Sequence, residues 1–535
     1  MITTNISRTL MTRELGRTRR RITTLGLGGQ SALMLTPEGV DPVAIIEKAY
    51  LAGITYFDTS NAYGPSQGHY GAAFRNLGLV PGTSNYDPVA RERIYLASKS
   101  HMRTTRHPNG SHWRNDYSDG MKDGTGVETA VDDVRRTLSL VFGDGRGQYP
   151  EGAYLDCIQI HNITAQDDVD MIYEGLDNPS PTAAWLGALI GLLDLREGTN
   201  RSGSNPKLER LVRHIGITGH WNSAAHIYAI QRDAFRLLDT LLVAVNPSDF
   251  NLFCHQHNAI PVAQAAGMGV IAMKVFADAS YYGEPPSFMR DATNIYRGVG
   301  SEALPSALFV QYALSVSGVT ACVIGIGQID SSDDPSKCQL TANILAAQID
   351  TPLSEKRRAE IEALINTAGL GNVTSYFQRP LVGLTPPRNV GAESDPGGFS
   401  PVTPNIRPAI RLTWDTAYAG KRAIERYEVL RDGKIVGTVP HEPQWTSKRF
   451  VFEDSFASNG ESPPTYTGKH GIVSYGALRA GEILDADPQK PQWTLQQSPS
   501  ADPSTGCDVG AHIYVVRAVD TEGGTADSDV LRVIR

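Results

Sequence analysis

Residues 54–64 of this chain read ITYFDTSNAYG, a short apolar run followed directly by polar side chains. The preceding stretch, Pro42–Leu51, carries apolar residues at helical spacing, so a helix is expected to lead into a buried strand over Ile54–Phe57. The polar groups that follow include Asp58 and Tyr63, and both can take part in acid–base chemistry. The pattern is typical of an α/β unit that carries functional side chains at the carboxyl end of its strand.

The same alternation of helix-like and strand-like segments continues from about residue 22 to residue 365. Apolar runs of this length, separated by helices, are typical of parallel strands buried on both faces. Further runs occur at Ile94–Ala97, Leu155–Ile160, His214–Ile217, Leu241–Val245, Gly269–Met273 and Ala321–Ile324. Seven or eight such units predict a closed (β/α)8 TIM barrel. The alternative is an open doubly wound sheet, which usually has a Gly-rich GxGxxG turn after its first strand, and this chain has none.

Two regions of the predicted barrel are too long to be simple connections. Residues 100–125 are rich in His, Arg, Asn, Asp and Gly, and residues 175–207 hold a short helix-like apolar piece, Ala183–Leu195, between polar flanks. Long loops on a barrel usually serve as lids or binding loops. We therefore expect both regions to lie near a binding site.

The composition changes near residue 378, which predicts a second domain. Residues 379–404 are rich in Pro, Gly and Ser and are interpreted as a linker that follows a barrel domain over residues 1–378. Residues 405–535 have no helical period, and Arg431–Lys434 has Asp-Gly at its centre, as in a hairpin turn. Alternating runs occur at Ala409–Trp414, Arg426–Leu430 and Ile513–Val519. The pattern predicts an all-β sandwich of immunoglobulin or fibronectin type III-like architecture.

The overall composition limits the classes of function. The 535 residues, 41% hydrophobic and 20% charged, are typical of a globular protein, and a net charge of −8 argues against a nucleic-acid-binding surface. Five widely spaced cysteines without a CxxC pair favour reduced thiols in a cytosolic protein. There is no apolar run of 18 residues, so no membrane span is predicted. Arg19–Arg21 imitates a twin-arginine export signal, but the apolar run after it is too short, so we expect a cytoplasmic protein.

Four chemically active side chains fall at or just after predicted strand ends. Asp58 and Tyr63 follow the first apolar run, Lys99 follows the second, and His161 follows the third. Alone, the Asp would be interpreted as a helix cap, the Lys as a surface charge and the His as a structural group with its hydrogen bonds satisfied. Four of them in this order at consecutive strand ends favour a catalytic site at the carboxyl end of the barrel.

Several stretches around these residues resemble one family. They are Arg13–Thr18, Leu25–Gly29, Gly53–Gly64, Leu155–His161, Gly216–Thr218, Gly269–Lys274 and Val323–Gly325. Together they resemble the aldo-keto reductase superfamily over roughly residues 13–367. The resemblance implies a (β/α)8 barrel and an oxidoreductase that transfers a hydride between a nicotinamide cofactor, NADP(H) or NAD(H), and a carbonyl or alcohol.

The residue types suit the roles that this resemblance implies. Tyr63 is the proton donor, although a phenol with a pKa of about 10 is a weak acid at neutral pH unless it is tuned. A nearby ammonium, here Lys99, favours the phenolate and lowers that pKa. Asp58 holds Lys99 charged and in place, and His161 donates a hydrogen bond to the substrate oxygen.

The resemblance also implies a cofactor site. Its residues are Thr218, Lys274, Gly325, Gln339 and Asn343. The loop that carries a basic residue for the 2′-phosphate of NADP in the family is enlarged and acidic here, with Asp330, Asp333 and Asp334 and one basic residue, Lys337. Because carboxylates repel a phosphate and accept hydrogen bonds from ribose hydroxyls, this loop weakens the preference for NADP and leaves both cofactors open.

One departure from the family affects the substrate side. Lys99 and His161 are 62 positions apart, and much of the excess is an insertion over His101–Gly126. We expect this insertion to line the substrate pocket or to pack as a solvated lid. The candidate pocket residues are His101, His107, His112, Trp113 and Trp221. The histidines could also be metal ligands, but their spacing fits no zinc pattern, so no metal is predicted.

Two other functions remain open. The chain could be a non-catalytic, cofactor-sensing or protein-binding subunit on the same fold, and the C-terminal domain would suit a partner role or a homo-oligomer. It could also act on a sugar or glycoside, because aromatic side chains near the predicted pocket offer faces for stacking on sugars. These are Trp113, Trp221, Tyr281 and Tyr282. The expected ligand in the enzymatic reading is a small carbonyl or alcohol.

Overall fold

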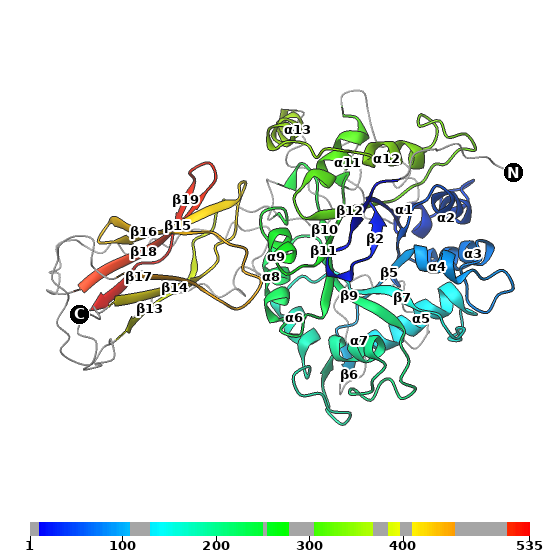
Figure 1. Ribbon diagram of the computed structural model, residues 1–535, viewed down its shortest axis with the longest axis horizontal. Helices are drawn as coiled ribbons and strands as arrows, with labels where there is room; N and C mark the ends of the chain where they lie inside the picture. The colour runs from blue at the N-terminus through cyan, green and yellow to red at the C-terminus, as the bar shows by residue number, and fades with distance from the viewer. Residues whose placement is uncertain are drawn as a thin grey trace. The chain divides into compact units, whose positions relative to one another are not determined.

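The computed structural model describes residues 10–106, 129–249, 254–277, 304–367, 383–395, 409–454 and 511–534. The chain divides into two compact units, Met1–Gln378 and Arg379–Arg535. In Figure 1 the first unit runs from blue to green, and the second is coloured from yellow to red. The first combines helices and strands, and the described part of the second consists of strands and loops.

Eight parallel strands in the described part of the first unit close into a barrel, which confirms the predicted (β/α)8 fold. Each strand pairs with its neighbours in the sheet, and β12 pairs with β3 to close the ring. The barrel strands are β3 (Leu25–Gly28), β4 (Tyr56–Asp58), β5 (Tyr95–Ser100), β7 (Leu155–Ile160), β9 (Val212–Gly219), β10 (Leu238–Ala244), β11 (Gly269–Met273) and β12 (Val319–Ile324).

Helices surround this barrel (Figure 1). Two of them are preceded by an Asp whose side chain caps the helix and is followed by a proline. The Asp41 carboxylate accepts hydrogen bonds from the first N–H groups of α2, and a proline follows it at the first helical position. Asp87 caps α4 in the same way. The helices are α1 (Ser31–Met34), α2 (Pro42–Leu51), α3 (Ser66–Asn76), α4 (Pro88–Arg93), α5 (Ala130–Phe142), α6 (Gln166–Tyr173), α7 (Ala188–Glu197), α8 (Ser223–Arg232), α9 (Ala259–Ala265), α11 (Ser306–Ser315), α12 (Gln339–Ala347) and α13 (Glu355–Thr367).

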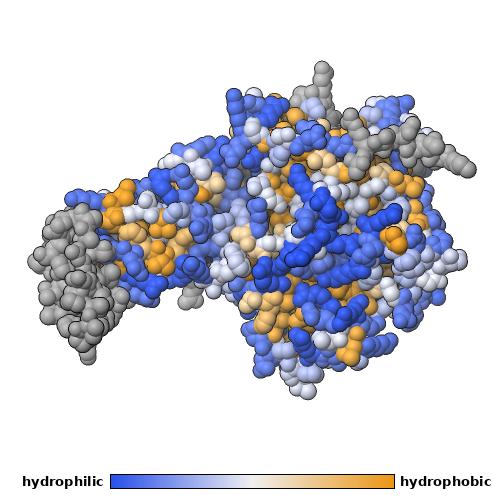
Figure 2. All heavy atoms as spheres, viewed as in Figure 1, coloured by the Kyte–Doolittle hydropathy of each residue, from blue (hydrophilic) through white to orange (hydrophobic). Residues whose placement is uncertain are grey.

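An antiparallel hairpin closes the end of the barrel where the strands begin. It consists of β1 (Thr12–Glu14), the 3-10 turn η1 (Gly16–Thr18) and β2 (Arg21–Thr23). Leu15 from this hairpin is fully buried in the barrel core, and Arg17 donates hydrogen bonds to Asp239 and to the Ala266 carbonyl. The surface around the hairpin is largely hydrophilic in Figure 2. Arg20 pairs with Glu92 and Arg21 donates to the Thr12 carbonyl, so these two residues of the Arg19–Arg21 cluster have a structural role.

The position of the first barrel strand corrects the sequence analysis. We took Ile54–Phe57 as the first strand of the series, but β3 precedes it and completes the barrel. Two of the four residues of β3, Gly26 and Gly28, are glycines, so its sequence lacks the apolar run expected of a buried strand. A Cβ at Gly26 would lie 2.5 Å from the Tyr56 ring, so the barrel requires a residue without a side chain there.

The two long regions of the barrel meet in a small antiparallel sheet. Strand β6 (Thr104–Arg106) follows β5 and pairs with β8 (Leu186–Gly187). The apolar piece predicted as one helix over Ala183–Leu195 is therefore divided, because its first part forms β8 and the helix α7 begins only at Ala188. Arg106 donates hydrogen bonds to the carbonyls of Pro181, Ala183 and Ser202, which ties the two regions together.

The second unit contains two antiparallel sheets within its described residues. One sheet has the order β13 (Arg388–Asp395), β14 (Ala409–Asp415), β17 (Phe450–Asp454). The other has the order β16 (Lys434–Pro440), β15 (Ile424–Arg431), β18 (Ala511–Asp520), β19 (Thr525–Asp527), with β20 (Leu531–Ile534) also paired to β18. The predicted hairpin turn joins β15 to β16, with Asp432 and Gly433 at φ values of 51° and 78°. Positive φ at both positions is the geometry that favours Asp-Gly in such turns.

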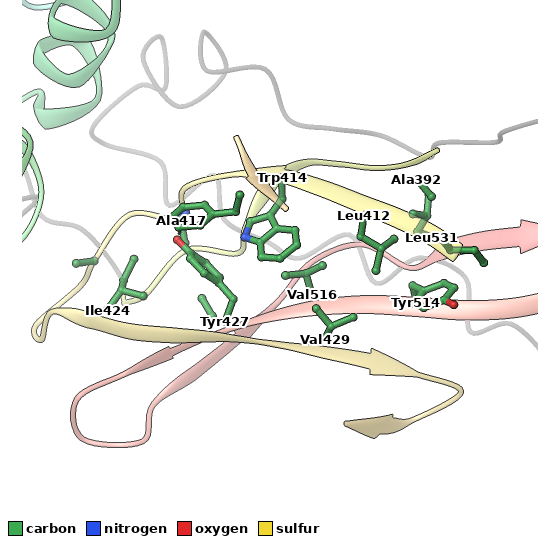
Figure 3. Close-up of a cluster of buried hydrophobic side chains, with 14 residues drawn as sticks. Ala392, Leu412, Trp414, Ala417, Ile424, Tyr427, Val429, Tyr514, Val516 and Leu531 are labelled. Atoms are coloured by element: carbon green, nitrogen blue, oxygen red, sulfur yellow. Dashed lines mark hydrogen bonds between the residues drawn. The ribbon is translucent and has the colours of Figure 1, made fainter. Parts of the chain in front are cut away.

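Side chains from both sheets of the second unit share one core (Figure 3). Trp414 from β14 is fully buried, and its ring stacks on Phe450 with centroids 5.9 Å apart. Tyr427 from β15 packs against Trp414 with its ring edge, at 5.6 Å, and Tyr514 from β18 lies in the same core. All three aromatic residues are therefore part of the core of the second unit.

The predicted linker over 379–404 needs a correction. Its Arg388–Asp395 segment is strand β13, which pairs with β14 from Asp415 back to Ala409. Ala392 of this strand is buried in the shared core. The Pro, Gly and Ser residues of this region made the strand unrecognisable in the sequence. Its hydrogen bonds to β14 stabilise it although several of its residues have a low propensity for strands.

Candidate active site

The four predicted site residues come together at the carboxyl ends of three adjacent barrel strands. Asp58 is the last residue of β4, Lys99 lies near the end of β5, and His161 directly follows β7. Strands β4, β5 and β7 are hydrogen-bonded neighbours. Tyr63 lies in the loop between β4 and α3 and is 8% exposed.

Lys99 and Asp58 form a buried ion pair. The Lys99 ammonium donates to Asp58 Oδ1 at 2.5 Å and to the Thr59 carbonyl at 2.9 Å. The same ammonium lies 4.7 Å from the centre of the Tyr63 ring. The pair therefore places a fixed positive charge against the face of Tyr63.

Burial and pairing shift the pKa values of the two partners in opposite directions. Burial raises the pKa of Asp58 and lowers the pKa of Lys99, while the attraction between the two charges opposes both shifts. We take the pair as charged, because its contact is short and each partner stabilises the other in a site of low polarity. Asp58 Oδ2 has no hydrogen-bond partner among the described residues.

His161 lies beside the Tyr63 ring, and its Nδ1 atom is in hydrogen-bond contact with the Ser60 hydroxyl. The edge of one ring faces the other, with centroids 5.8 Å apart. His161 Nδ1 lies 3.2 Å from Ser60 Oγ. Burial, with a further contribution from the neighbouring His101 and Lys99, holds the pKa of His161 well below its ordinary value. The imidazole is therefore neutral at physiological pH.

The sequence analysis missed one residue of the site, Arg103, and named a second, His101, only as a residue that lines the pocket. His101, predicted only as a pocket residue, stacks on His161 with ring centroids 4.0 Å apart. The fully buried Arg103 donates to the carbonyls of His101, His161 and Asn162, and it pairs with Asp168 at 3.2 Å. The available signal was the alternation Lys99, His101, Arg103, because alternate residues of an extended chain lie on one side.

Three predicted cofactor residues lie at or just after the carboxyl ends of strands β9, β11 and β12. Thr218 belongs to β9, and its hydroxyl accepts the Asn162 N–H at 3.3 Å. Lys274 follows β11 with a φ of 56°, and its ammonium is 3.3 Å from Gln30 Oε1. Gly325 follows β12 and is exposed.

The other two predicted cofactor residues belong to α12. The Gln339 side-chain oxygen accepts the N–H groups of Gly327 and Gln328, at 2.9 and 3.0 Å, so this residue fixes the loop after β12. Asn343 is 7% exposed, one turn further along the helix. In the acidic loop, Asp333 pairs with Lys48 at 3.2 Å, and Asp330 and Asp334 each accept hydrogen bonds from a serine two residues later.

The predicted substrate residues are only partly described. Trp221 is half-buried and directly follows His220, a buried residue just after β9. Trp113, His107, His112, Tyr281 and Tyr282 lie outside the described residues.

Within the described ranges, no group of three or more His, Cys, Asp or Glu residues is arranged to hold a metal ion. No helix among the described residues is long and apolar enough to span a membrane.

The barrel agrees with a comparison against protein families. The model of the Aldo/keto reductase family matches residues 24–366. The chain belongs to this family, and the barrel unit is accordingly that of an oxidoreductase. A search of curated proteins found no match.

Solved structures of other family members are similar to the chain at low sequence identity. An aldo/keto reductase of Klebsiella pneumoniae, in complex with NADP and acetate, is 17% identical, with 66% of this chain and 95% of that chain covered and a TM-score of 0.37. The aldo-keto reductase of Bacillus halodurans in its holo form is 18% identical, with coverages of 66% and 96% and a TM-score of 0.39. That of Bombyx mori, in complex with NADP, is 17% identical, with coverages of 67% and 94% and a TM-score of 0.39.

Proposed function

We propose that this protein is an NAD(P)-dependent oxidoreductase that transfers a hydride between a nicotinamide cofactor and a carbonyl or alcohol, with Tyr63 as general acid and base. One observation carries the proposal. The Lys99 ammonium lies between the Asp58 carboxylate, at 2.5 Å, and the Tyr63 ring, at 4.7 Å from its centre. This is the arrangement that a phenol needs in order to exchange a proton near neutral pH.

The roles of the side chains follow from the charge that develops on the substrate. Negative charge builds on a carbonyl oxygen that receives a hydride, and the site must protonate or stabilise it. Tyr63 gives its phenolic proton to this oxygen, and the fixed charge of Lys99 stabilises the phenolate that remains. Asp58 keeps Lys99 charged in a buried position. In the oxidation direction, Tyr63 accepts the proton back.

His161 supplies a second contact to the same oxygen. Its ring faces Tyr63 edge-on, and its pKa lies well below the ordinary value because it is buried near other positive groups. A neutral imidazole has one N–H, so it donates a hydrogen bond to the oxygen without competing with Tyr63 as an acid.

The cofactor site fits the residues on one side of the barrel. Lys274 offers a cation for a phosphate group, Thr218 offers a hydroxyl group near the end of β9, and Asn343 offers an amide on α12. Gly325 lies directly against Ser31, and a Cβ there would be only 2.3 Å from that residue, so this position after β12 requires a residue without a side chain. The bound nicotinamide supplies or accepts the hydride, which no side chain can do.

The second unit is proposed as a fibronectin type III-like sandwich with a role in association. Its two antiparallel sheets around one aromatic core support the sandwich architecture. Appended domains of this kind commonly bind partner proteins or second copies of the chain.

We also propose a cytoplasmic location, because the sparse and unpaired cysteines of the sequence favour a reducing compartment.

A screen for turnover tests the proposal. The protein is assayed with aldehydes, ketones, alcohols and sugars, each with NADPH or NADH in the reducing direction and NADP or NAD in the oxidising direction. Binding of each cofactor is measured in parallel by fluorescence titration. We expect cofactor binding and turnover of at least one substrate class. Binding without any turnover would favour the cofactor-sensing subunit, and the absence of both would overturn the proposal.

A further inference from the structure

Ser60 makes two hydrogen bonds behind the His161 ring. Its hydroxyl oxygen lies 3.2 Å from His161 Nδ1 and also accepts the N–H of Ala62 at 3.2 Å. Ser60 is fully buried, and its hydroxyl has no other partner among the described residues. The environment of this hydroxyl therefore limits where its single hydrogen can point.

This geometry determines which nitrogen of His161 carries a hydrogen. A serine hydroxyl has one hydrogen and two acceptor positions, and Ala62 uses one of the acceptor positions. If Nδ1 carried the hydrogen, Ser60 would accept twice, and its own buried O–H would have no acceptor, which is unfavourable. Donation from Ser60 to Nδ1 avoids this cost and places the hydrogen of the neutral ring on Nε2.

Two further contacts fix the plane of the His161 ring. The His101 ring stacks on it at 4.0 Å with an angle of 26° between the planes. Arg103 donates to the main-chain carbonyls of both histidines, at 3.2 Å to His101 and 2.9 Å to His161. Nε2 has no hydrogen-bond partner among the described residues, so its N–H is free to meet a ligand.

We propose that Ser60 is a positioning residue that sets His161 in the Nε2–H tautomer, so that this nitrogen donates to the substrate oxygen. The proposal rests on the proposed function for the identity of that ligand. The tautomer itself does not depend on it, because it follows from contacts within the protein.

Nitrogen NMR of the protein with 15N-labelled histidine tests the tautomer directly. The signals of His161 are assigned by their loss in His161→Gln. We expect the wild type and Ser60→Thr, which keeps the hydroxyl, to carry the hydrogen on Nε2, and Ser60→Ala to show a mixture of both tautomers. A wild type with the hydrogen on Nδ1, or an unchanged tautomer in Ser60→Ala, would overturn the proposal.

A double-mutant cycle tests whether Ser60 acts through His161. Ser60→Ala should lower kcat about tenfold, with an unchanged Kd for the cofactor, and Ser60→Thr should retain most of the activity. In the His161→Gln background, Ser60→Ala should cause no further loss. Independent, additive losses would refute the positioning role. If the wild type turns over no substrate but shows Nε2–H, the proposed function fails and the tautomer assignment stands.

Discussion

The Lys99 ammonium and the Asp58 carboxylate form an ion pair whose two side chains are 1% and 5% exposed. Removing one partner from such a pair leaves an uncompensated buried charge, which typically costs about 3–5 kcal/mol. Removing both charges costs less, because neither is left unpaired. The pair is therefore needed both for the charge beside Tyr63 and for the stability of the barrel around it.

Asp58→Asn should lower both the thermal stability and kcat, because Lys99 then loses its counter-charge. The double variant Asp58→Asn/Lys99→Met should be more stable than Asp58→Asn alone while remaining inactive. Calorimetry and steady-state kinetics measure the two effects. A single variant with the stability of the wild type would show that the pair is not charged.

Tyr63→Phe removes the proposed proton donor and keeps the ring that packs against Lys99. We expect kcat to fall about 100-fold or more while the Kd for the cofactor is unchanged. Lys99→Met should lower kcat similarly, since Tyr63 then loses its charged neighbour. Tyr149→Phe is a matched control, because this half-buried hydroxyl bonds Glu209 away from the site. Near-full turnover in Tyr63→Phe would refute the assignment of the four residues.

The acidic loop after β12 should reduce the preference for NADP. Asp330 and Asp334 have lowered pKa values because serine side-chain and main-chain groups donate to them, so both are charged at neutral pH. We expect the Kd for NADPH to be less than about 100-fold below that for NADH, a gap of about 2.7 kcal/mol. Calorimetric titrations of both cofactors provide the measurement, and a larger gap would contradict the prediction.

Substitutions in the loop give a second test of cofactor preference. Asp330→Asn/Asp334→Asn should shift binding toward NADPH, because two charges that repel the 2′-phosphate are removed. Asp177→Asn, which changes an exposed carboxylate between α6 and β8, is the control and should leave the ratio of the two Kd values unchanged. An equal effect of the two variants would point to net charge alone.

The raised pKa of the buried Asp133 side chain should make the stability of the protein depend on pH. Burial raises its pKa to about 7, although Ser100 donates to its carboxylate at 2.5 Å, whereas in the unfolded chain the pKa is about 3.9. The folded state therefore retains a proton that the unfolded chain releases. This contribution is complete below about pH 4 and is lost as the pH rises toward 7.

Denaturant unfolding at pH 5 and pH 7.5 tests this contribution. The free energy of unfolding of the wild type should fall by on the order of 2 kcal/mol more than that of Asp133→Asn over this interval. Asp177→Asn, which changes an exposed carboxylate far along the chain from Asp133, is the control. A pH dependence identical in the wild type and Asp133→Asn would contradict the raised pKa.

A chain ending at Gln378 should bind a nicotinamide cofactor. It contains the four proposed catalytic residues and all eight strands of the barrel. Solubility and cofactor titration of the truncated chain provide the measurement. A truncated chain that is insoluble or binds no cofactor would show that the second unit contributes to the stability of the barrel or to its site. A truncated chain that binds the cofactor but has lost its affinity for the substrate would show that the second unit contributes to the substrate pocket.

The sequence by itself determined the barrel and the residues at its strand ends. Strands buried on both faces are commonly apolar runs, so Leu241–Val245 and Gly269–Met273 are recognisable without any knowledge of their neighbours. Asp58, Lys99 and His161 follow such runs, and the barrel brings consecutive strand ends together. The alternating strands and the Asp-Gly turn of the second unit were recognisable for the same reason, because each depends on local chemistry.

Only the tertiary structure decided the features that depend on contacts between distant segments. Strand β3 is half glycine, and its place in the barrel follows from the close approach of Tyr56. Strand β13 exists because β14 offers it hydrogen bonds. The stacking of His101 on His161 joins residues 60 positions apart, and no local pattern encodes a ring contact of 4.0 Å. Propensity and periodicity act over a few residues, whereas packing and pairing are settled only when the chain closes on itself.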